Sequence, residues 1–252
     1  MNLKTLFGTF VLMILCSGAP AMATEHAIPV ASQQMVLVLA ESENSQTAML
    51  YTFYRDQAHW QSHSGPVPVT LGRTGLAWGI GLHPAQIGVQ KREGDGKAPA
   101  GVFYLGDAFG AGSELVTGLH YQPMTKEHYC VDVPASPLYN QTLIKTDANA
   151  ELIDGSTEPM RRDLHLKDSQ YNKGIFVGHN PHNQAGAGSC IFMHIWRAAD
   201  KPTAGCTALD ESAIDQLLAW LKADQSPVLV QLTRADYQRL RADWALPLVT
   251  VP

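Results

Sequence analysis

The sequence predicts a mainly β fold with one or two helices. Its 252 residues include 21 glycines and 15 prolines, so many turns are expected. Most apolar runs have the length of a strand and are bounded by turn residues. One segment, residues 210–223, instead repeats its apolar residues with a helical period. We find no linker, and we therefore expect one domain over residues 35–252.

The first residues have the features of a secretory signal. Lys4 supplies a positive charge, Leu6–Leu15 is apolar, and Ala21-Met22-Ala23 fits an A-x-A cleavage site. We expect residues 1–23 to be removed after Ala23 and the mature chain to be periplasmic. A membrane anchor is disfavoured because the apolar stretch is short. Lipoprotein processing at Cys16 is disfavoured because the residue before it is not small.

The first half of the domain predicts a hairpin and an edge strand. After a short lead-in at 24–34, Met35–Ala40 is apolar throughout, as expected of a buried strand. Ala48–Arg55 alternates in polarity and is rich in aromatic residues, which favours a second strand. Pro66–Arg73 is expected at a sheet edge, where proline is tolerated. Residues 74–100 are rich in glycine and are expected to form a loop.

The second half combines further strands with one clear helix. Residues 131–140 and 146–170 are polar and are expected to be irregular. Asp210 is a suitable N-cap for the predicted helix at 210–223, and a short helix is expected near 234–242. The remaining strands are expected at Gly101–Leu105, Gly174–His179, Cys190–Trp196 and Pro227–Leu232.

Charge and missing motifs exclude several classes of protein. The net charge is −5, and removal of the signal makes the mature chain about one unit more negative, which argues against nucleic-acid binding. No apolar run after residue 30 approaches the roughly 18 residues of a membrane span. The sequence contains no phosphate-binding loop of the G-x-x-x-x-G-K-[ST] type and no G-x-S-x-G elbow.

The cysteine count predicts one disulfide and one free thiol. Loss of Cys16 with the signal leaves Cys130, Cys190 and Cys206, an odd number in an oxidising compartment. The pairing is open at this point.

Histidines and cysteines also suggest a zinc site as an alternative. His179, His182, Cys190, His194 and Cys206 lie close in sequence and have suitable donor atoms. Their spacing matches no common metal pattern, and no carboxylate occurs between residues 174 and 199. We therefore expect neither a metal nor another cofactor.

A candidate nucleophile lies in Thr203-Ala204-Gly205-Cys206-Thr207. Gly205 permits a tight turn that presents the sulfur, and the first amides of the following helix favour a thiolate. His194 lies twelve residues upstream at the end of a predicted strand. A histidine–cysteine pair is a known base–nucleophile arrangement. The alternative is that Cys206 is a small buried residue and His194 a core histidine.

Three segments together resemble the YkuD-type L,D-transpeptidase family. Cys190–Leu209 resembles its catalytic segment, in which a strand ending in histidine precedes Ser/Thr-x-Gly-Cys. Lys91–Phe103 resembles its Gly-Thr-Pro-x-Gly-x-Phe segment, and Pro68–Gly75 the strand and turn before it. The resemblance covers roughly residues 35–235. It implies a β-sandwich or barrel whose main helix follows the cysteine loop.

The chain departs from the family pattern near the cysteine. Thr203-Ala204 replaces the usual Ser-His, and Ala208 replaces an Arg or Asn. Tyr129–Asn140 and Ser156–Asp163 are additional segments typical of a divergent branch. These differences bear on the choice of acceptor, because His194 and Cys206 are both retained.

The resemblance implies a peptidoglycan stem peptide as substrate. Cys206 would attack the carbonyl between meso-diaminopimelate and D-alanine, while His194 moves the proton. The thioester would pass to an amine or to water, with the oxyanion held by amides at Thr203, Gly205 and Cys206. No cofactor is implied, and we expect a monomer.

The resemblance also suggests supporting residues. A Cys130–Cys190 disulfide would leave Cys206 free, whereas a Cys190–Cys206 bond or two buried thiols are alternatives. Side chains that would line the groove or read the substrate's charges are His179, Asn180, Glu158, Arg161, Arg162 and Arg197. For the charged residues the alternative is a solvated surface.

Three other functions remain open from the sequence alone. The first is a peptidoglycan-binding module without activity, which the changes at Ala204 and Ala208 permit. The second is a papain-like peptidase, although there the nucleophile precedes the histidine. The third is a zinc amidase.

Overall fold

The computed structural model describes residues 27–249. The predicted signal at 1–23 and the start of the lead-in lie outside this range. Within it, strands hold 36% of the residues and helices 13%, so the fold is mainly β, as predicted. Between residues 27 and 249, no helix has the length and apolar character required to cross a membrane.

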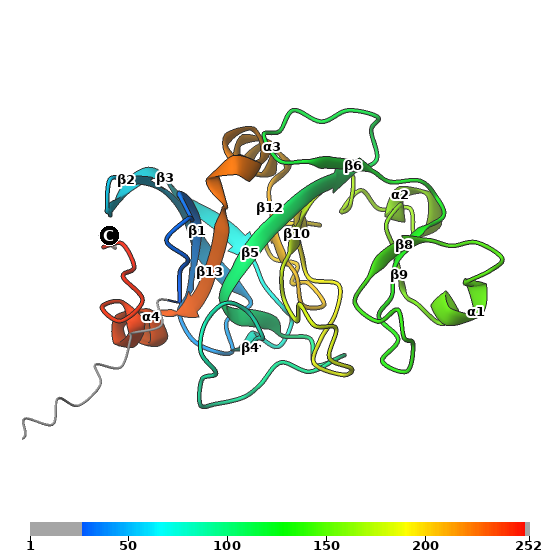
Figure 1. Ribbon diagram of the computed structural model, residues 1–252, viewed down its shortest axis with the longest axis horizontal. Helices are drawn as coiled ribbons and strands as arrows, with labels where there is room; N and C mark the ends of the chain where they lie inside the picture. The colour runs from blue at the N-terminus through cyan, green and yellow to red at the C-terminus, as the bar shows by residue number, and fades with distance from the viewer. Residues whose placement is uncertain (1–26, 250–252) are drawn as a thin grey trace, which may run out of the picture.

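The strands form a closed barrel (Figure 1). Around the barrel the strand order is β10-β11-β12-β3-β2-β1-β13-β5, and pairing of β10 with β5 closes the ring. The bounds of these strands are β1 Gln34–Ala40, β2 Thr47–Asp56, β3 His59–Thr70, β5 Ala98–Gly110, β10 Lys173–Val177, β11 Phe192–Ile195, β12 Thr207–Leu209 and β13 Val228–Thr233.

Three adjacent strands of the barrel, β2, β1 and β13, correspond to apolar runs of the sequence. Every residue of β1 is buried, and β1 pairs antiparallel with β2 and parallel with β13. The expected strands at 35–40, 48–55 and 227–232 are therefore confirmed, with their bounds shifted by a residue or two. Continuous apolar sequence is typical of strands covered on both sides.

In the glycine- and proline-rich region one expectation is wrong, and another is correct but too short. Residues 74–100 are not all loop, because β4 (Leu76–Trp78) lies within them and β5 begins at Ala98. The short strand expected at 101–105 is part of this much longer strand. Gly101 has a φ of +138°, and a Cβ there would meet the His83 ring at 1.9 Å, so the strand needs glycine at this point.

The strand expected at the sheet edge also differs from its prediction. β3 begins at His59 and ends at Thr70, before the Leu71–Arg73 part of the predicted range. Its last residues, Val69 and Thr70, pair with β12 as well as with β2, so this end lies inside the sheet. Proline is accommodated upstream, where β3 has only β2 as a partner.

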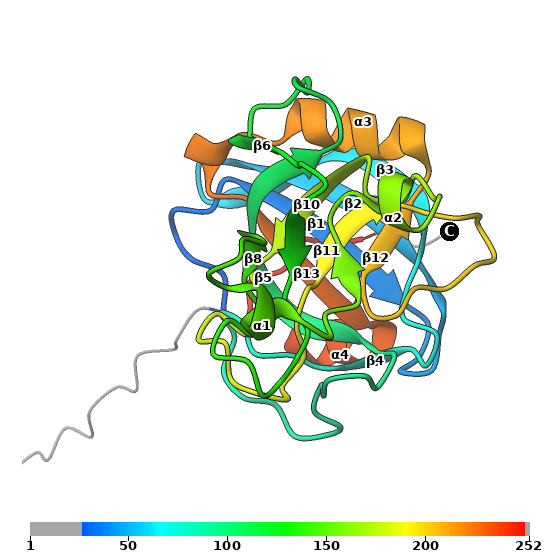
Figure 2. The same cartoon turned by 90° about the vertical axis from the view of Figure 1, so that its right-hand side faces the viewer.

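A small second sheet stands beside the barrel (Figures 1 and 2). Its order is β8-β7-β9, and the stretch at 146–170 that we expected to be irregular contains one of its strands and two one-turn helices. Short polar strands give little periodic signal, which is why the sequence did not predict them. The elements are β6 Tyr121–Pro123, which extends the barrel sheet, β7 His128–Cys130, β8 Thr142–Ile144, β9 Glu158–Pro159, α1 Ala150–Ile153 and α2 Arg162–His165.

Two longer helices pack on opposite ends of the barrel (Figure 2). α3 (Glu211–Trp220) follows β12, and the predicted N-cap is confirmed, since the Asp210 side chain accepts a hydrogen bond from the Ser212 amide at 2.9 Å. α3 ends before the predicted limit because Leu221 is extended. α4 (Arg234–Leu240) corresponds to the predicted short helix, and a 3-10 turn spans Ala223–Gln225.

Candidate active site

The candidate base lies on β11, and the candidate nucleophile lies just before the neighbouring strand β12. β11 pairs with β12 in parallel, with Met193 opposite Thr207, so His194 and the residue before β12, Cys206, come close to one another. Both side chains line a cleft of about 290 Å³ between the barrel and the small sheet. Other residues on this cleft include Arg73, Lys91, Glu93, Asp132, Glu158, Arg162, Tyr171 and Arg197.

Cys206 has a buried thiol with two backbone partners. The sulfur accepts a hydrogen bond from the Phe192 amide at 3.3 Å and donates to the Cys190 carbonyl at 3.6 Å. Burial, followed by the negative charge of Glu158, raises the pKa of the thiol to about 12. Cys206 therefore rests as a neutral thiol when the cleft holds no substrate.

His194 is fixed in one tautomer by the chain itself. Its Nδ1 lies 2.8 Å from the Ile195 carbonyl oxygen, which can only accept, so Nδ1 carries the proton. Nε2 then has a lone pair available for a proton. Burial lowers the pKa of the imidazole to about 4, so His194 is neutral at pH 7.

The turn before Cys206 is held by the Thr203 side chain. The Thr203 hydroxyl donates to the Cys206 carbonyl at 2.6 Å and accepts from the Gly205 amide at 3.1 Å. The Thr203 amide donates to Leu71. Two of the amides expected to hold an oxyanion are thus already hydrogen-bonded, the Gly205 amide within the turn and the Thr203 amide to Leu71. The hydrogen bonds of the Thr203 hydroxyl fix the turn that carries Cys206.

Three of the predicted charged residues face the cleft, and one does not. Glu158, Arg162 and Arg197 line it. Arg162 is bonded to both carboxylate oxygens of Asp168, at distances of 2.7–3.2 Å. Arg161 does not line this cleft. Its guanidinium is bonded instead to Asp163 and to the Met124 carbonyl.

His179 and Asn180, expected to line the groove, instead hold loops together. His179 is 3% exposed, and its ring nitrogens are bonded to the Ile80 amide at 3.3 Å and the Ala187 carbonyl at 3.0 Å. Asn180 is fully buried and bonded to the backbone of the loop that follows it. Neither side chain lines the cleft that contains Cys206.

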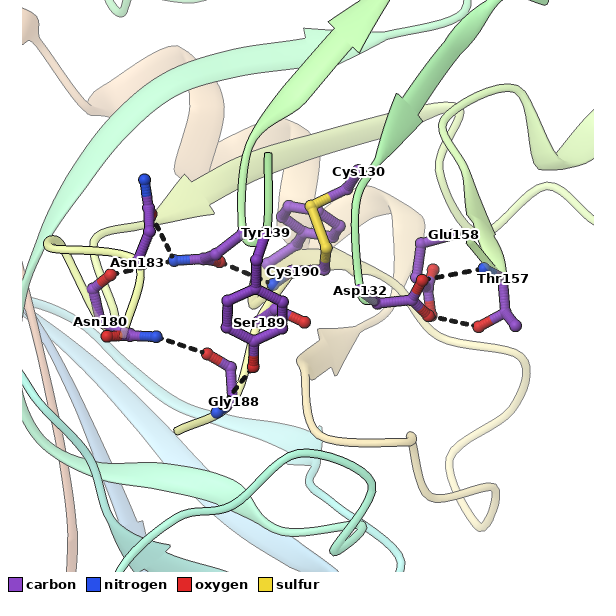
Figure 3. Close-up of a disulfide and its surroundings, with 12 residues drawn as sticks. Cys130, Asp132, Tyr139, Thr157, Glu158, Asn180, Asn183, Gly188, Ser189 and Cys190 are labelled. Atoms are coloured by element: carbon purple, nitrogen blue, oxygen red, sulfur yellow. Dashed lines mark hydrogen bonds between the residues drawn. A yellow bond between two sulfur atoms is a disulfide. The ribbon is translucent and has the colours of Figure 1, made fainter. Parts of the chain in front are cut away.

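A disulfide joins the small sheet to the barrel (Figure 3). It links Cys130 at the end of β7 to Cys190 just before β11, and Cys206 is free. Asp132 and Glu158 lie on one side of it and Asn180 on the other. The alternative zinc cluster therefore loses Cys190 to the disulfide and His179 to backbone bonds, and residues 27–249 contain no group of potential ligands able to hold a metal.

Several cleft residues were missed by sequence reasoning. Tyr171 and Asp132 lie in polar stretches without periodicity. Glu93 and Lys91 lie in Lys91–Phe103, where the residue pattern predicts a family resemblance but no role for either side chain. Glu93 accepts hydrogen bonds from Tyr139 and Ser189, which come from distant parts of the chain. These residues are far apart in the sequence, and folding is what brings them close to one another.

The comparison with family models places the chain in the class of L,D-transpeptidase-like domains. The model of the YkuD family, the L,D-transpeptidase catalytic domain, matches residues 43–230, and the chain belongs to that family. No curated protein matches the chain.

Two solved structures are similar to this chain, both of the helical cell shape determining protein Pgp2 from Campylobacter jejuni. The crystal structure of a point mutant gives a TM-score of 0.39 and 14% identity, over 80% of this chain and 47% of that one. The structure of Pgp2 itself gives a TM-score of 0.36 and 13% identity, over 80% and 48%. The chain spans about half the length of these proteins.

Proposed function

We propose that this protein is an L,D-transpeptidase of peptidoglycan in which Cys206 is the nucleophile and His194 moves the proton. The observation that carries the proposal is that His194 on β11 and Cys206 just before the adjacent strand β12 line one cleft, while Cys206 stays outside the disulfide. A histidine and a free cysteine held in this way are the components of covalent acyl transfer.

Without substrate, the Cys206 thiol and the His194 imidazole are both uncharged. The pKa of the Cys206 thiol lies at about 12 and that of His194 at about 4, so an ion pair is disfavoured without substrate. The proton therefore moves as the substrate binds and the thiol attacks. Because Nδ1 of His194 donates to the Ile195 carbonyl, Nε2 is the atom that takes the proton.

The reaction begins at the bond between meso-diaminopimelate and D-alanine. The Cys206 sulfur bonds to the carbonyl carbon, its proton passes to Nε2 of His194, and the oxyanion is held by the Cys206 amide. Collapse breaks the carbon–nitrogen bond, and His194 returns the proton to the leaving D-alanine. An acceptor amine then attacks the thioester, which releases the thiol. Water as acceptor would make the enzyme a carboxypeptidase or a cross-link hydrolase.

Charged residues on the cleft suit the side chain of the proposed substrate. The side chain of meso-diaminopimelate ends in an ammonium and a carboxylate. Glu158 offers an acceptor to the first, while Arg162 and Arg197 offer donors to the second. In this proposal residues 35–252 act as one catalytic domain and the protein works as a monomer.

The proposed substrate also determines the compartment in which the protein must act. Peptidoglycan lies outside the cytoplasm, so the proposed activity requires export, which the predicted signal at residues 1–23 would direct. A disulfide between Cys130 and Cys190 is stable in such an oxidising compartment.

The proposal is tested with purified muropeptides. The protein and its Cys206→Ala variant are incubated with tetrapeptide muropeptides, and the products are identified by mass spectrometry. We expect the protein to release D-alanine and form a cross-linked product, and the variant to do neither.

Other products would change the conclusion in defined ways. Release of D-alanine without a cross-link identifies water as the acceptor and a carboxypeptidase. Binding of muropeptides without turnover by either protein would identify an inactive binding module and overturn the proposal. Turnover by Cys206→Ala equal to that of the unmodified protein would overturn the assignment of the nucleophile.

A further inference from the structure

Arg73 lies beside the turn that carries Cys206 and has no part in the mechanism above. Its amide donates to the Thr203 carbonyl at 2.9 Å, and its carbonyl accepts from the Gln46 side chain at 2.6 Å. The residue is exposed and lines the same cleft as Cys206. Because its backbone is held on both sides, the Arg73 side chain starts from a fixed point on the wall of the cleft.

Three segments of the chain meet at this wall, and glycines allow them to come close. A Cβ on Gly72 would lie 2.3 Å from the Gly96 carbonyl oxygen. A Cβ on Gly205 would lie 3.1 Å from the Lys97 carbonyl oxygen. The three backbones are therefore packed against one another without intervening side chains. Such packing fixes the place of Arg73 relative to the turn at Gly205.

The Arg73 side chain lies over the backbone of the middle segment. A Cβ on Gly96 would come within 2.9–3.0 Å of three of its atoms, Cγ, Nε and Cζ. One guanidinium nitrogen donates to the carbonyl of Gly94, which also lines the cleft, at 3.4 Å. This is the one hydrogen bond that the guanidinium makes within residues 27–249. Its other N–H donors are therefore available to a ligand.

The guanidinium of Arg73 also lacks a partner of opposite charge in the described part of the chain. Between residues 27 and 249, no carboxylate lies within ion-pairing distance of it. The two acidic residues of the adjacent segment are engaged elsewhere. Asp95 is paired with Lys91 at 2.6 Å, and Glu93 accepts a hydrogen bond from Tyr139. Arg73 thus brings an uncompensated positive charge to the cleft.

The two other arginines of the cleft differ from Arg73. Arg162 is bonded to both carboxylate oxygens of Asp168, which offsets its charge. The Arg197 side chain makes no hydrogen bond within residues 27–249, so a ligand would have to order it first. Of the three, Arg73 combines a free charge with a side chain that is already held in place, which lowers the entropy cost of binding an anion.

We propose that Arg73 forms a carboxylate-binding subsite of the cleft and holds one carboxylate of the stem peptide. A guanidinium presents parallel N–H donors that match the two oxygens of a carboxylate. The inference rests on the proposed function for the identity of this ligand. A tetrapeptide stem offers carboxylates on D-glutamate, on the side chain of meso-diaminopimelate and on the terminal D-alanine, and the same chemistry recognises each of them.

The test changes the carboxylates of the ligand one at a time. The full chain with Cys206→Ala, which prevents turnover, is titrated by calorimetry with the tetrapeptide and with three single amides of it. Each amide keeps the size of the group but removes its charge. Because a hydrogen bond to a charged group is stronger than one to a neutral group, we expect loss of the carboxylate bound by Arg73 to weaken binding about tenfold.

Arg73→Gln in the same background identifies which carboxylate Arg73 binds. The variant should bind the tetrapeptide about tenfold more weakly and should no longer discriminate against one of the three amides. Arg73→Lys retains the charge and should restore part of that discrimination. Each ratio compares ligands on one protein sample, so a change in stability alone leaves it unaltered.

Arg92→Gln is the matched control. Arg92 is exposed on the adjacent segment but does not line the cleft. We expect its affinities for the tetrapeptide and for all three amides to equal those of the Cys206→Ala protein.

Three results would overturn the inference. They are unchanged discrimination against all three amides in Arg73→Gln, an equal loss in Arg92→Gln, and no binding of the tetrapeptide by Cys206→Ala. Failure of the inference is distinguishable from failure of the proposed function. Discrimination that depends on Arg73, without turnover of muropeptides by the unmodified protein, would support the subsite and reject the transpeptidase. Turnover with discrimination that is independent of Arg73 would do the reverse.

Discussion

The thiol of Cys206 donates a hydrogen bond to the backbone carbonyl of Cys190, with 3.6 Å between sulfur and oxygen. Cys190 is itself tied to Cys130, and its φ of +56° is one that residues other than glycine seldom adopt. Its amide is held by the Asn140 side chain at 3.0 Å. The disulfide and the proposed nucleophile therefore meet at the backbone of one residue.

Removal of the disulfide should destabilise the whole protein. The bond closes a loop with a sequence separation of 60 residues, which corresponds to about 4 kcal/mol of stability in the loop-entropy description. We expect a Cys130→Ser/Cys190→Ser double variant to lose stability of this order in urea unfolding. Changing both cysteines avoids a new bond between Cys190 and Cys206.

Cys206→Ser serves as the control for this experiment. It alters one buried sulfur but leaves the disulfide, so its free energy of unfolding should change far less. A double variant that unfolds at the same urea concentration as the unmodified protein would show that the disulfide does not stabilise the fold.

The barrel could be predicted wherever strands are buried on both faces. β1 and β13 are continuous apolar runs, and the helix after the cysteine has both a period and a cap at Asp210. β4 and the first residues of β5 were not predicted because the glycine-rich sequence of residues 74–100 resembles a loop. Within β5, Gly101 makes room for the His83 ring.

The sequence was sufficient to propose the pair His194 and Cys206, but not the residues that surround them. His194 and Cys206 were proposed from residue type, spacing and resemblance, and the fold brings them to one cleft. His179, like His194, is a histidine at the end of a predicted strand. Its ring nitrogens are nevertheless hydrogen-bonded to backbone groups outside the cleft. Tyr171 reaches the cleft only through the packing of β10 against β11, which no local pattern encodes.

Thr203 provides a test of the turn that carries the nucleophile. Thr203→Val preserves the shape of the side chain but removes both hydrogen bonds of its hydroxyl, to the Cys206 carbonyl and from the Gly205 amide. The sulfur is then less firmly placed, and displacement of a reacting atom by about 1 Å can slow a reaction about 100-fold. We therefore expect the rate of D-alanine release from muropeptides to fall about 10- to 100-fold.

Thr203→Ser retains the hydroxyl and is the matched variant for that measurement. It should keep most of the activity, since both hydrogen bonds can form. Equal activities in the valine and serine variants would mean that the hydroxyl does not position Cys206.

Buried titratable groups make stability depend on pH. Burial lowers the pKa of His179 and of His194 to about 4, below the usual 6.5 of the unfolded chain. Between those values the unfolded state binds more protons, so these histidines make stability fall as the pH drops through that window. Glu158 has the opposite sign, because its pKa rises to about 7 and the folded state binds the extra proton between about 4.5 and 7.

His179→Gln should flatten the acid side of this profile. Glutamine can still hydrogen bond but does not titrate, so the variant loses one of the two histidine contributions. Each proton of difference changes the free energy of unfolding by about 1.4 kcal/mol per pH unit. We therefore expect the stability difference between the protein and the variant to be largest at pH 7 and to shrink by up to that amount per unit below pH 6.5. Urea unfolding at pH 5, 6, 7 and 8 measures it, and a difference independent of pH would mean that His179 is not held neutral by burial.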